Sequence, residues 1–235
     1  MNYNKRYSDL CNSYKQGADI YLNETNVGIK FYRFKSILNE CVNAQVASDN
    51  YINENISFSY PVFIPHKTKI KNYEEAIILL HGLNERNWDK YLTWAEYLCV
   101  NSGKPVILFP IAYHINRAPS SWSNPRKMIT LLNQRKEKYD DDRSMSFANV
   151  ALSSRLSQNP ERFYMSGRQT WSDLTSLFEI IINGQHPLFK EGAKADIFAY
   201  SIGAFLSQVA LIANQKNLFS NTKLFMFCGG SIFNS

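Results

Sequence analysis

The chain has 235 residues, of which 45% are hydrophobic and 20% are charged, and its formal net charge is +6. This composition excludes a disordered or fibrous protein and favours one large α/β domain with a single core. No apolar run approaches the ~20 residues of a membrane-spanning helix, and no signal-peptide pattern follows the first basic residues, so we expect a cytoplasmic protein without a membrane span.

Basic residues are densest between Arg126 and Arg143, where Asp140, Asp141 and Asp142 interrupt them. A solvated loop or helix face is the simpler interpretation, and we expect no nucleic-acid partner. The cysteines at positions 11, 41, 99 and 228 form no C-x-x-C pair and have no neighbouring histidine cluster. We therefore expect no metal and no cofactor, and we predict buried, reduced thiols at positions 99 and 228.

The first half of the chain predicts the opening of a sheet. Alternating apolar residues at 27–32 and 56–60 indicate two half-buried strands that pair antiparallel, and Pro61 places the second at an edge or a bend. Continuous apolar runs at 76–80 and 106–109 are typical of central strands covered on both faces. Between them, apolar residues three and four apart predict a helix over 88–99 that ends at Gly103, which completes a βαβ unit.

The second half continues the alternation of strands and helices. No clean period dominates between 111 and 168, so this segment is expected to pass over the sheet edge. Thr170 and Asp173 resemble a helix-start box before a helix over 171–182. Strands are predicted at 195–198 and 224–228, with a helix over 204–213 between them. The fold class is α/β, with a mainly parallel sheet flanked by helices.

A serine marks the corner where the strand at 195–198 meets its helix. The sequence Ala199-Tyr200-Ser201-Ile202-Gly203 follows the G-x-S-x-G pattern of a nucleophile elbow, with alanine at the first glycine position. Small residues are expected on either side because a larger group would collide with the backbone of the serine itself. The simpler alternative is that Ser201 is an ordinary helix N-cap.

With His81-Gly82 after one buried strand and the serine elbow after another, the chain resembles the α/β-hydrolase superfamily of esterases, lipases and thioesterases. The likeness covers about residues 55–235 and points to a bacterial branch to which no substrate can be carried over. It implies that Ser201 is the nucleophile and that the backbone N–H groups of Leu83 and Ile202 form the oxyanion hole. The supporting motif residues would be His81, Gly82, Ala199 and Gly203.

The resemblance also implies a domain plan and a reaction. Residues 51–235 would form the hydrolase-like domain, with 111–168 as a candidate cap, and residues 1–50 would be an N-terminal extension of unclear role. The substrate would be a small-molecule acyl ester or thioester, hydrolysed through a Ser201 acyl-enzyme. Nothing in the sequence predicts the oligomeric state.

The family's catalytic acid and histidine have no counterpart after the elbow. All four histidines (66, 81, 114 and 186) precede Ser201, and no Asp or Glu follows it. One interpretation is that the chain is part of a longer protein, inactive alone, whose sheet is incomplete at its C-terminal edge. A second is a non-catalytic protein of this fold that binds a ligand or partner. A third is that His114, which follows the strand that ends at Phe109, is recruited as the base. The simpler alternative for His114 is a loop histidine that forms a hydrogen bond with nearby backbone.

Overall fold

The computed structural model describes residues 2–37, 52–65, 73–119, 122, 125–138, 150, 153, 157 and 159–229. The main helices in these ranges are α1 (Tyr3–Ser13), α2 (Asn53–Ile56), α3 (Asp89–Ser102), α4 (Pro125–Lys138), α6 (Arg162–Ile182) and α7 (Ile202–Ala213). The strands are β1 (Ile20–Leu22), β2 (Val27–Lys35), β3 (Ser57–Pro65), β4 (Tyr73–Leu80), β5 (Val106–Leu108), β6 (Phe189–Tyr200) and β7 (Leu224–Phe227).

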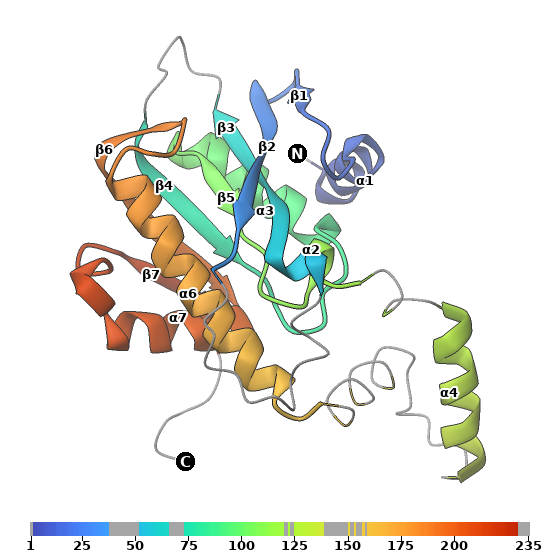
Figure 1. Ribbon diagram of the computed structural model, residues 1–235. Helices are drawn as coiled ribbons and strands as arrows, with labels where there is room; N and C mark the ends of the chain where they lie inside the picture. Colours follow the sequence, from blue (N-terminus) through green and yellow to red (C-terminus); the bar gives the residue numbers. More distant parts are fainter. Residues whose placement is uncertain are drawn as a thin grey trace.

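The seven strands of the described residues form one mixed sheet in the order β1-β2-β3-β5-β4-β6-β7 (Figure 1). The pairs from β1 through β2 and β3 to β5 are antiparallel, and the pairs from β5 through β4 and β6 to β7 are parallel. The predicted antiparallel opening and the predicted βαβ unit of β4, α3 and β5 are both confirmed. The protein has an α/β fold.

Helices cover both faces of the sheet, so the fold has three layers (Figure 1). Along β4, Ile78 and Leu80 join the core cluster that contains residues of α6 and α7. Leu79 points the other way and joins the cluster that contains residues of α1 and α3. Because successive side chains of a strand alternate between faces, a continuous apolar run is what a strand buried on both sides requires. The prediction of a central strand at 76–80 is confirmed.

Residues 2–37 contribute α1, β1 and β2, and these two strands belong to the same sheet as the later ones. A buried ion pair attaches α1 to α3, since the guanidinium of Arg6 donates to both carboxylate oxygens of Glu96. The division of the chain at residue 50 stays a prediction. His66 and Cys41 lie outside the described residues.

Pro61 lies in an interior strand, so the prediction that its strand lies at an edge is wrong. It stands opposite Phe31 of β2, whereas β5 pairs with β3 only at Val62 and Phe63. Because the register with β5 does not include position 61, proline's missing N–H removes no bond from that ladder.

The helix predicted from 171 begins earlier, at Arg162, so Thr170 and Asp173 are not a helix-start box. Both side chains are buried in the middle of α6. The Thr170 hydroxyl donates to the carbonyl of Ser166 and accepts from the N–H of Ala112. Polar residues that would favour a helix cap form tertiary hydrogen bonds here instead.

α4 lies in the segment for which the sequence showed no clear period, and it stands apart from the sheet in Figure 1.

β7 is the last strand of the sheet, and its side chains are largely exposed. Phe225, Met226 and Phe227 are all exposed, and so is Cys228 just after them. The strand itself is confirmed, but the predicted burial of Cys228 is wrong, whereas Cys99 is buried as predicted. Apolar sequence alone does not distinguish a central strand from an edge strand with an uncovered side.

Candidate active site

Ser201 occupies a strained corner between β6 and α7, with φ 54° and ψ −115°. Few residues other than glycine adopt this conformation, which costs about 1–3 kcal/mol and persists only where neighbours enforce it. Here the Ser201 N–H donates to the carbonyl of Phe227 at 3.0 Å, and the Ser201 carbonyl accepts from the N–H of Ala204 at 3.0 Å. The serine hydroxyl makes no capping hydrogen bond to α7. The helix-cap interpretation therefore does not account for this serine.

Gly203 is required by the close approach of α7 to the end of β4. A Cβ at this position would lie 2.8 Å from the carbonyl oxygen of His81 and 2.9 Å from that of Leu80. The predicted need for a small residue here thus has a second cause, because a larger residue would collide with the end of the neighbouring strand. Ala199, at the other small position, is fully buried and lies opposite Leu80 in the parallel pair of β4 and β6.

The loop after β4 packs directly against the elbow. A Cβ at Gly82 would lie 2.9 Å from the ring of Tyr200 and 3.5 Å from Cβ of Ser201. The structure thus brings together the two motifs that the sequence places more than a hundred residues apart. β4 and β6 are parallel neighbours, so both motifs lie at the carboxyl edge of the sheet, where ligands bind in open α/β folds.

The N–H groups of Leu83 and Ile202 are the expected oxyanion-hole donors. Within the part of the chain that the structure describes, neither N–H has a hydrogen-bond acceptor, and both residues line the same cavity. The N–H of Gly82, in contrast, donates to the hydroxyl of Tyr91 at 2.8 Å.

Tyr91 and Glu85 hold this loop in place, a role that was not predicted from the sequence. Tyr91 lies in the apolar stripe of α3, and its hydroxyl donates to Glu85 Oε1 at 2.6 Å while it accepts from Gly82. Burial raises the pKa of the Tyr91 phenol above its ordinary value, so the hydroxyl keeps its proton for Glu85. Lys90 pairs with the same carboxylate at 3.2 Å. This chain of contacts fixes the peptide that precedes Leu83.

His81 links the loop after β4 to the loop after β5. Its Nδ1 lies 2.7 Å from the carbonyl of Gly82, and its Nε2 accepts from the N–H of Ile111 at 2.9 Å. The proton is therefore on Nδ1, which donates to Gly82. Burial lowers the pKa of His81 well below its ordinary value, and the imidazole stays neutral. With both ring nitrogens engaged, His81 holds the loops together and does not serve as a base.

His114 is buried in the loop after β5 and lines the same cavity as Leu83 and Ile202. Its Nδ1 lies 2.9 Å from the carbonyl of Ala112, the backbone bond expected of a loop histidine. That bond places the proton on Nδ1, so Nε2 is the basic nitrogen. The imidazole ring centre is 5.3 Å from that of His81.

The cavity has a volume of about 500 Å³ and lies between α6, α7 and the loop after β5. It falls in the size range of small-molecule sites. Its described lining residues are Leu83, Ile111, Tyr113, His114, Trp122, Arg162, Phe163, Tyr164, Ser166, Gly167, Arg168, Trp171, Ile202, Phe205, Leu206, Val209 and Ala213.

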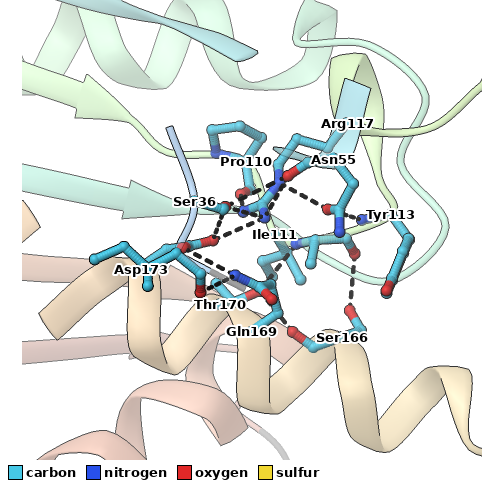
Figure 2. A network of polar contacts seen from close by, with 12 residues as sticks. Ser36, Asn55, Pro110, Ile111, Tyr113, Arg117, Ser166, Gln169, Thr170 and Asp173 are labelled. Atoms are coloured by element: carbon cyan, nitrogen blue, oxygen red, sulfur yellow. Dashed lines mark hydrogen bonds and ion pairs between the residues drawn. The ribbon is translucent and has the colours of Figure 1, made fainter. Parts of the chain in front are cut away.

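A buried polar network anchors one wall of this cavity (Figure 2). Arg117, which is fully buried, donates to Asp173 of α6 at 2.7 Å and to the side chain of Asn55 at 3.0 Å. Ser36 donates to the same Asp173 oxygen at 2.8 Å. Burial raises the pKa of Asp173, and the neighbouring guanidinium opposes that change. The network ties the loop that carries His114 to α6.

His186 is buried, although a proline follows it in the sequence. Its Nδ1 accepts from the N–H of Leu188 at 3.2 Å, and its Nε2 donates to the hydroxyl of Tyr60 at 3.0 Å. The proline beside it suggested an exposed loop, but aromatic neighbours enclose the ring: its centre is 4.7 Å from that of Tyr32. His186 belongs to the core and lies outside the site.

Two general features are absent from the described residues. No helix among them has the length and apolar character that crossing a membrane requires. No cluster of three or more His, Cys, Asp and Glu side chains suited to a metal ion occurs among them.

The sequence has no significant match among curated proteins. It is similar to the structure of a cold-adapted esterase from an Arctic intertidal metagenomic library, with 10% identity and a TM-score of 0.45 over 86% of this chain and 62% of that one. It is also similar to a "putative acetyl xylan esterase" from Bacteroides fragilis, with 11% identity and a TM-score of 0.42 over 88% of this chain and 48% of that one. The chain thus spans less than two thirds of the length of either structure. A family model matches residues 39–235, most of the sequence, and the chain belongs to the Family of unknown function (DUF6051).

Proposed function

We propose that this chain carries the nucleophile and oxyanion hole of a serine hydrolase that acts on an acyl ester or thioester. The observation that carries the proposal is the meeting of two motifs at one sheet edge. Ser201 is held in a strained conformation with a hydroxyl that does not cap its helix, beside the loop of Gly82 and Leu83. The mixed sheet, with its parallel half centred on β4 and β6, supports the α/β-hydrolase resemblance.

In the proposed reaction, Ser201 Oγ attacks the carbonyl carbon of the substrate while a base removes the hydroxyl proton. The oxyanion accepts hydrogen bonds from the N–H groups of Leu83 and Ile202. The base then protonates the departing alcohol or thiol, and water hydrolyses the acyl-enzyme by the reverse sequence. Loss of one oxyanion donor typically costs about 2.7–4 kcal/mol of transition-state stabilisation. That neither N–H has an acceptor among the described residues supports this role.

The base is proposed to come from one of two places. The first is a histidine outside these 235 residues, as the α/β-hydrolase resemblance implies, in which case the chain alone has little or no activity. The second is His114, whose Nδ1–H is held by a backbone carbonyl and whose residue lines the cavity. A carbonyl orients the ring as a carboxylate does, but it stabilises the imidazolium less.

Reaction with an alkyl fluorophosphonate tests the proposal. The 235-residue chain and the protein made from its natural gene are both treated with the reagent, together with Ser201→Ala and His114→Gln variants shown to be folded. We expect the reagent to label Ser201 in the wild-type protein, and we expect Ser201→Ala to abolish the labelling. Labelling of the longer protein alone assigns the base to the added sequence, and labelling of this chain that His114→Gln abolishes assigns it to His114. A folded gene product that no fluorophosphonate labels contradicts the hydrolase.

A second candidate is a non-catalytic protein that binds a ligand at the same edge. It is favoured by His81, the histidine in the loop that packs against the elbow, because both of its ring nitrogens are engaged in hydrogen bonds and neither is available as a base. This candidate predicts that ligand affinity is the same in wild type and Ser201→Ala and that neither form turns an ester over.

A further inference from the structure

The cavity beside Ser201 combines apolar walls with positively charged side chains. Among its described lining residues, two are arginines and none is an aspartate or glutamate. The guanidinium of Arg162 lies 4.6 Å above the ring of Trp122. Arg168 is partly buried and has neither an ion pair nor a hydrogen bond with its side chain among the described residues. A cation held against apolar walls without a partner favours an anionic ligand.

A second donor without an acceptor lies on the same wall. The indole nitrogen of Trp171 is buried and has no hydrogen-bond partner within the described residues. Trp171 follows Arg168 by three residues in α6, so the two side chains are neighbours on one helix face. Buried polar groups are nearly always satisfied in native structures, and an acceptor on a bound ligand would satisfy this one.

The remaining walls of the cavity indicate the length and the apolar character of the rest of the ligand. One face of α7 lines the cavity from Ile202, next to Ser201, through Phe205 and Val209 to Ala213. Since a helix rises about 1.5 Å per residue, this face is roughly 16 Å long. A volume of about 500 Å³ is far larger than an acetyl group needs.

We propose that the cavity takes an amphipathic acyl compound, with an apolar chain lying along α7 and an anionic group bound by Arg168 of α6. The inference rests on the proposed function in one respect, because that function places the reacting carbonyl of the acyl compound at Ser201. The ligand class itself rests on Arg168, Trp171 and the apolar walls.

Binding of three eight-carbon probes tests the proposal: octanoate, 1-octanol and octylamine. Affinities are measured by titration calorimetry and by the emission of the tryptophans that line the cavity. We expect octanoate to bind about tenfold more tightly than octanol, as a charge-assisted contact implies, and octylamine to bind more weakly than either. The Arg168→Gln variant brings the ratio of octanoate to octanol affinity close to one, and Arg168→Lys restores part of it. Arg33→Gln, at an exposed position on β2, keeps the wild-type ratio and is the matched control.

The outcomes separate this inference from the proposed hydrolase. Equal affinities for octanoate and octanol in a protein whose Ser201 reacts with fluorophosphonate overturn the ligand class and leave the hydrolase standing. An octanoate preference that depends on Arg168, in a protein whose Ser201 does not react, supports the ligand class and overturns the hydrolase. An octanoate preference that is the same in Arg168→Gln and Arg168→Lys overturns the role of Arg168.

Discussion

Ser201 adopts a backbone conformation that favours glycine, and its neighbours hold it there through the hydrogen bonds to Phe227 and Ala204. Replacement with glycine removes the side chain that causes the strain, at the cost of greater freedom in the unfolded chain. We expect Ser201→Gly to raise the free energy of unfolding by about 1 kcal/mol relative to Ser201→Ala, which keeps the strain. Urea denaturation of the two variants measures the difference. A Ser201→Gly variant less stable than Ser201→Ala would show that the corner stores no strain.

Two glycines provide a matched pair at the same site. A Cβ at Gly203 meets the backbone of β4, whereas a Cβ at Gly167 in α6 meets no atom within 4 Å. We expect Gly203→Ala to lower the free energy of unfolding by about 1–3 kcal/mol because the elbow must move. Gly167→Ala is expected to raise it by about 0.4–1 kcal/mol, since alanine is the better helix former. Equal effects of the two substitutions in urea denaturation would contradict the close packing of α7 on β4.

Some of the elements that surround the site were predicted correctly from the sequence, and others were not. The runs at 76–80 and 106–109 predicted central strands because burial on both faces leaves a local signature, and β4 and β5 confirm them. The start of α6 was missed because Thr170 and Asp173 face inward in the helix, and local sequence does not distinguish such residues from a cap. Tyr91 reads as an ordinary apolar position in α3, and only the tertiary structure reveals its contact with Gly82.

Between elements, the buried ion pair of Arg117 and Asp173 links the loop after β5 to α6. Both side chains are fully or almost fully buried, so Asp173→Asn leaves an uncompensated guanidinium in the core. We expect a loss of about 3–5 kcal/mol in the free energy of unfolding, measured by urea denaturation. The matched control is Glu179→Gln, which breaks the more exposed pair with Lys216 and is expected to cost less than about 1 kcal/mol. Similar losses in the two variants would contradict a structural role for the buried network.

Across the whole molecule, the buried histidines make stability depend on pH. Burial lowers the pKa of His186 from 6.5 to about 4, so the unfolded chain takes up the proton first as the pH falls. The contribution of His186 is complete above pH 6.5 and is lost as the pH falls through about 4. Buried His81 acts in the same direction. Urea denaturation between pH 7.5 and 4.5 should show a free energy of unfolding that falls with pH, with at most about 1.4 kcal/mol per pH unit from one histidine. His186→Asn should reduce the slope; an unchanged slope would contradict the burial of a neutral imidazole.

At the same scale, the sequence predicted the fold class and the antiparallel opening of the sheet, since both follow from local periodicity. It did not predict β1, the short strand that pairs with β2 at the edge of the sheet, because three residues are too few to show a periodic pattern. The two motifs are a different case: His81-Gly82 and the serine elbow were linked by the α/β-hydrolase resemblance, and the structure places Gly82 beside Ser201.

We propose that Ser201 is an activated nucleophile, and the position of a fluorophosphonate adduct tests this proposal. Peptide mass spectrometry of the labelled natural gene product locates the modified side chain. The buried hydroxyl of Ser207, which donates to the carbonyl of Gly203 in the same helix, supplies the matched control. We predict one adduct, on the peptide that contains Ser201, which persists in Ser207→Ala and disappears in Ser201→Ala. An adduct on another residue, or a folded protein that remains unmodified, would contradict the assignment of Ser201 as the nucleophile.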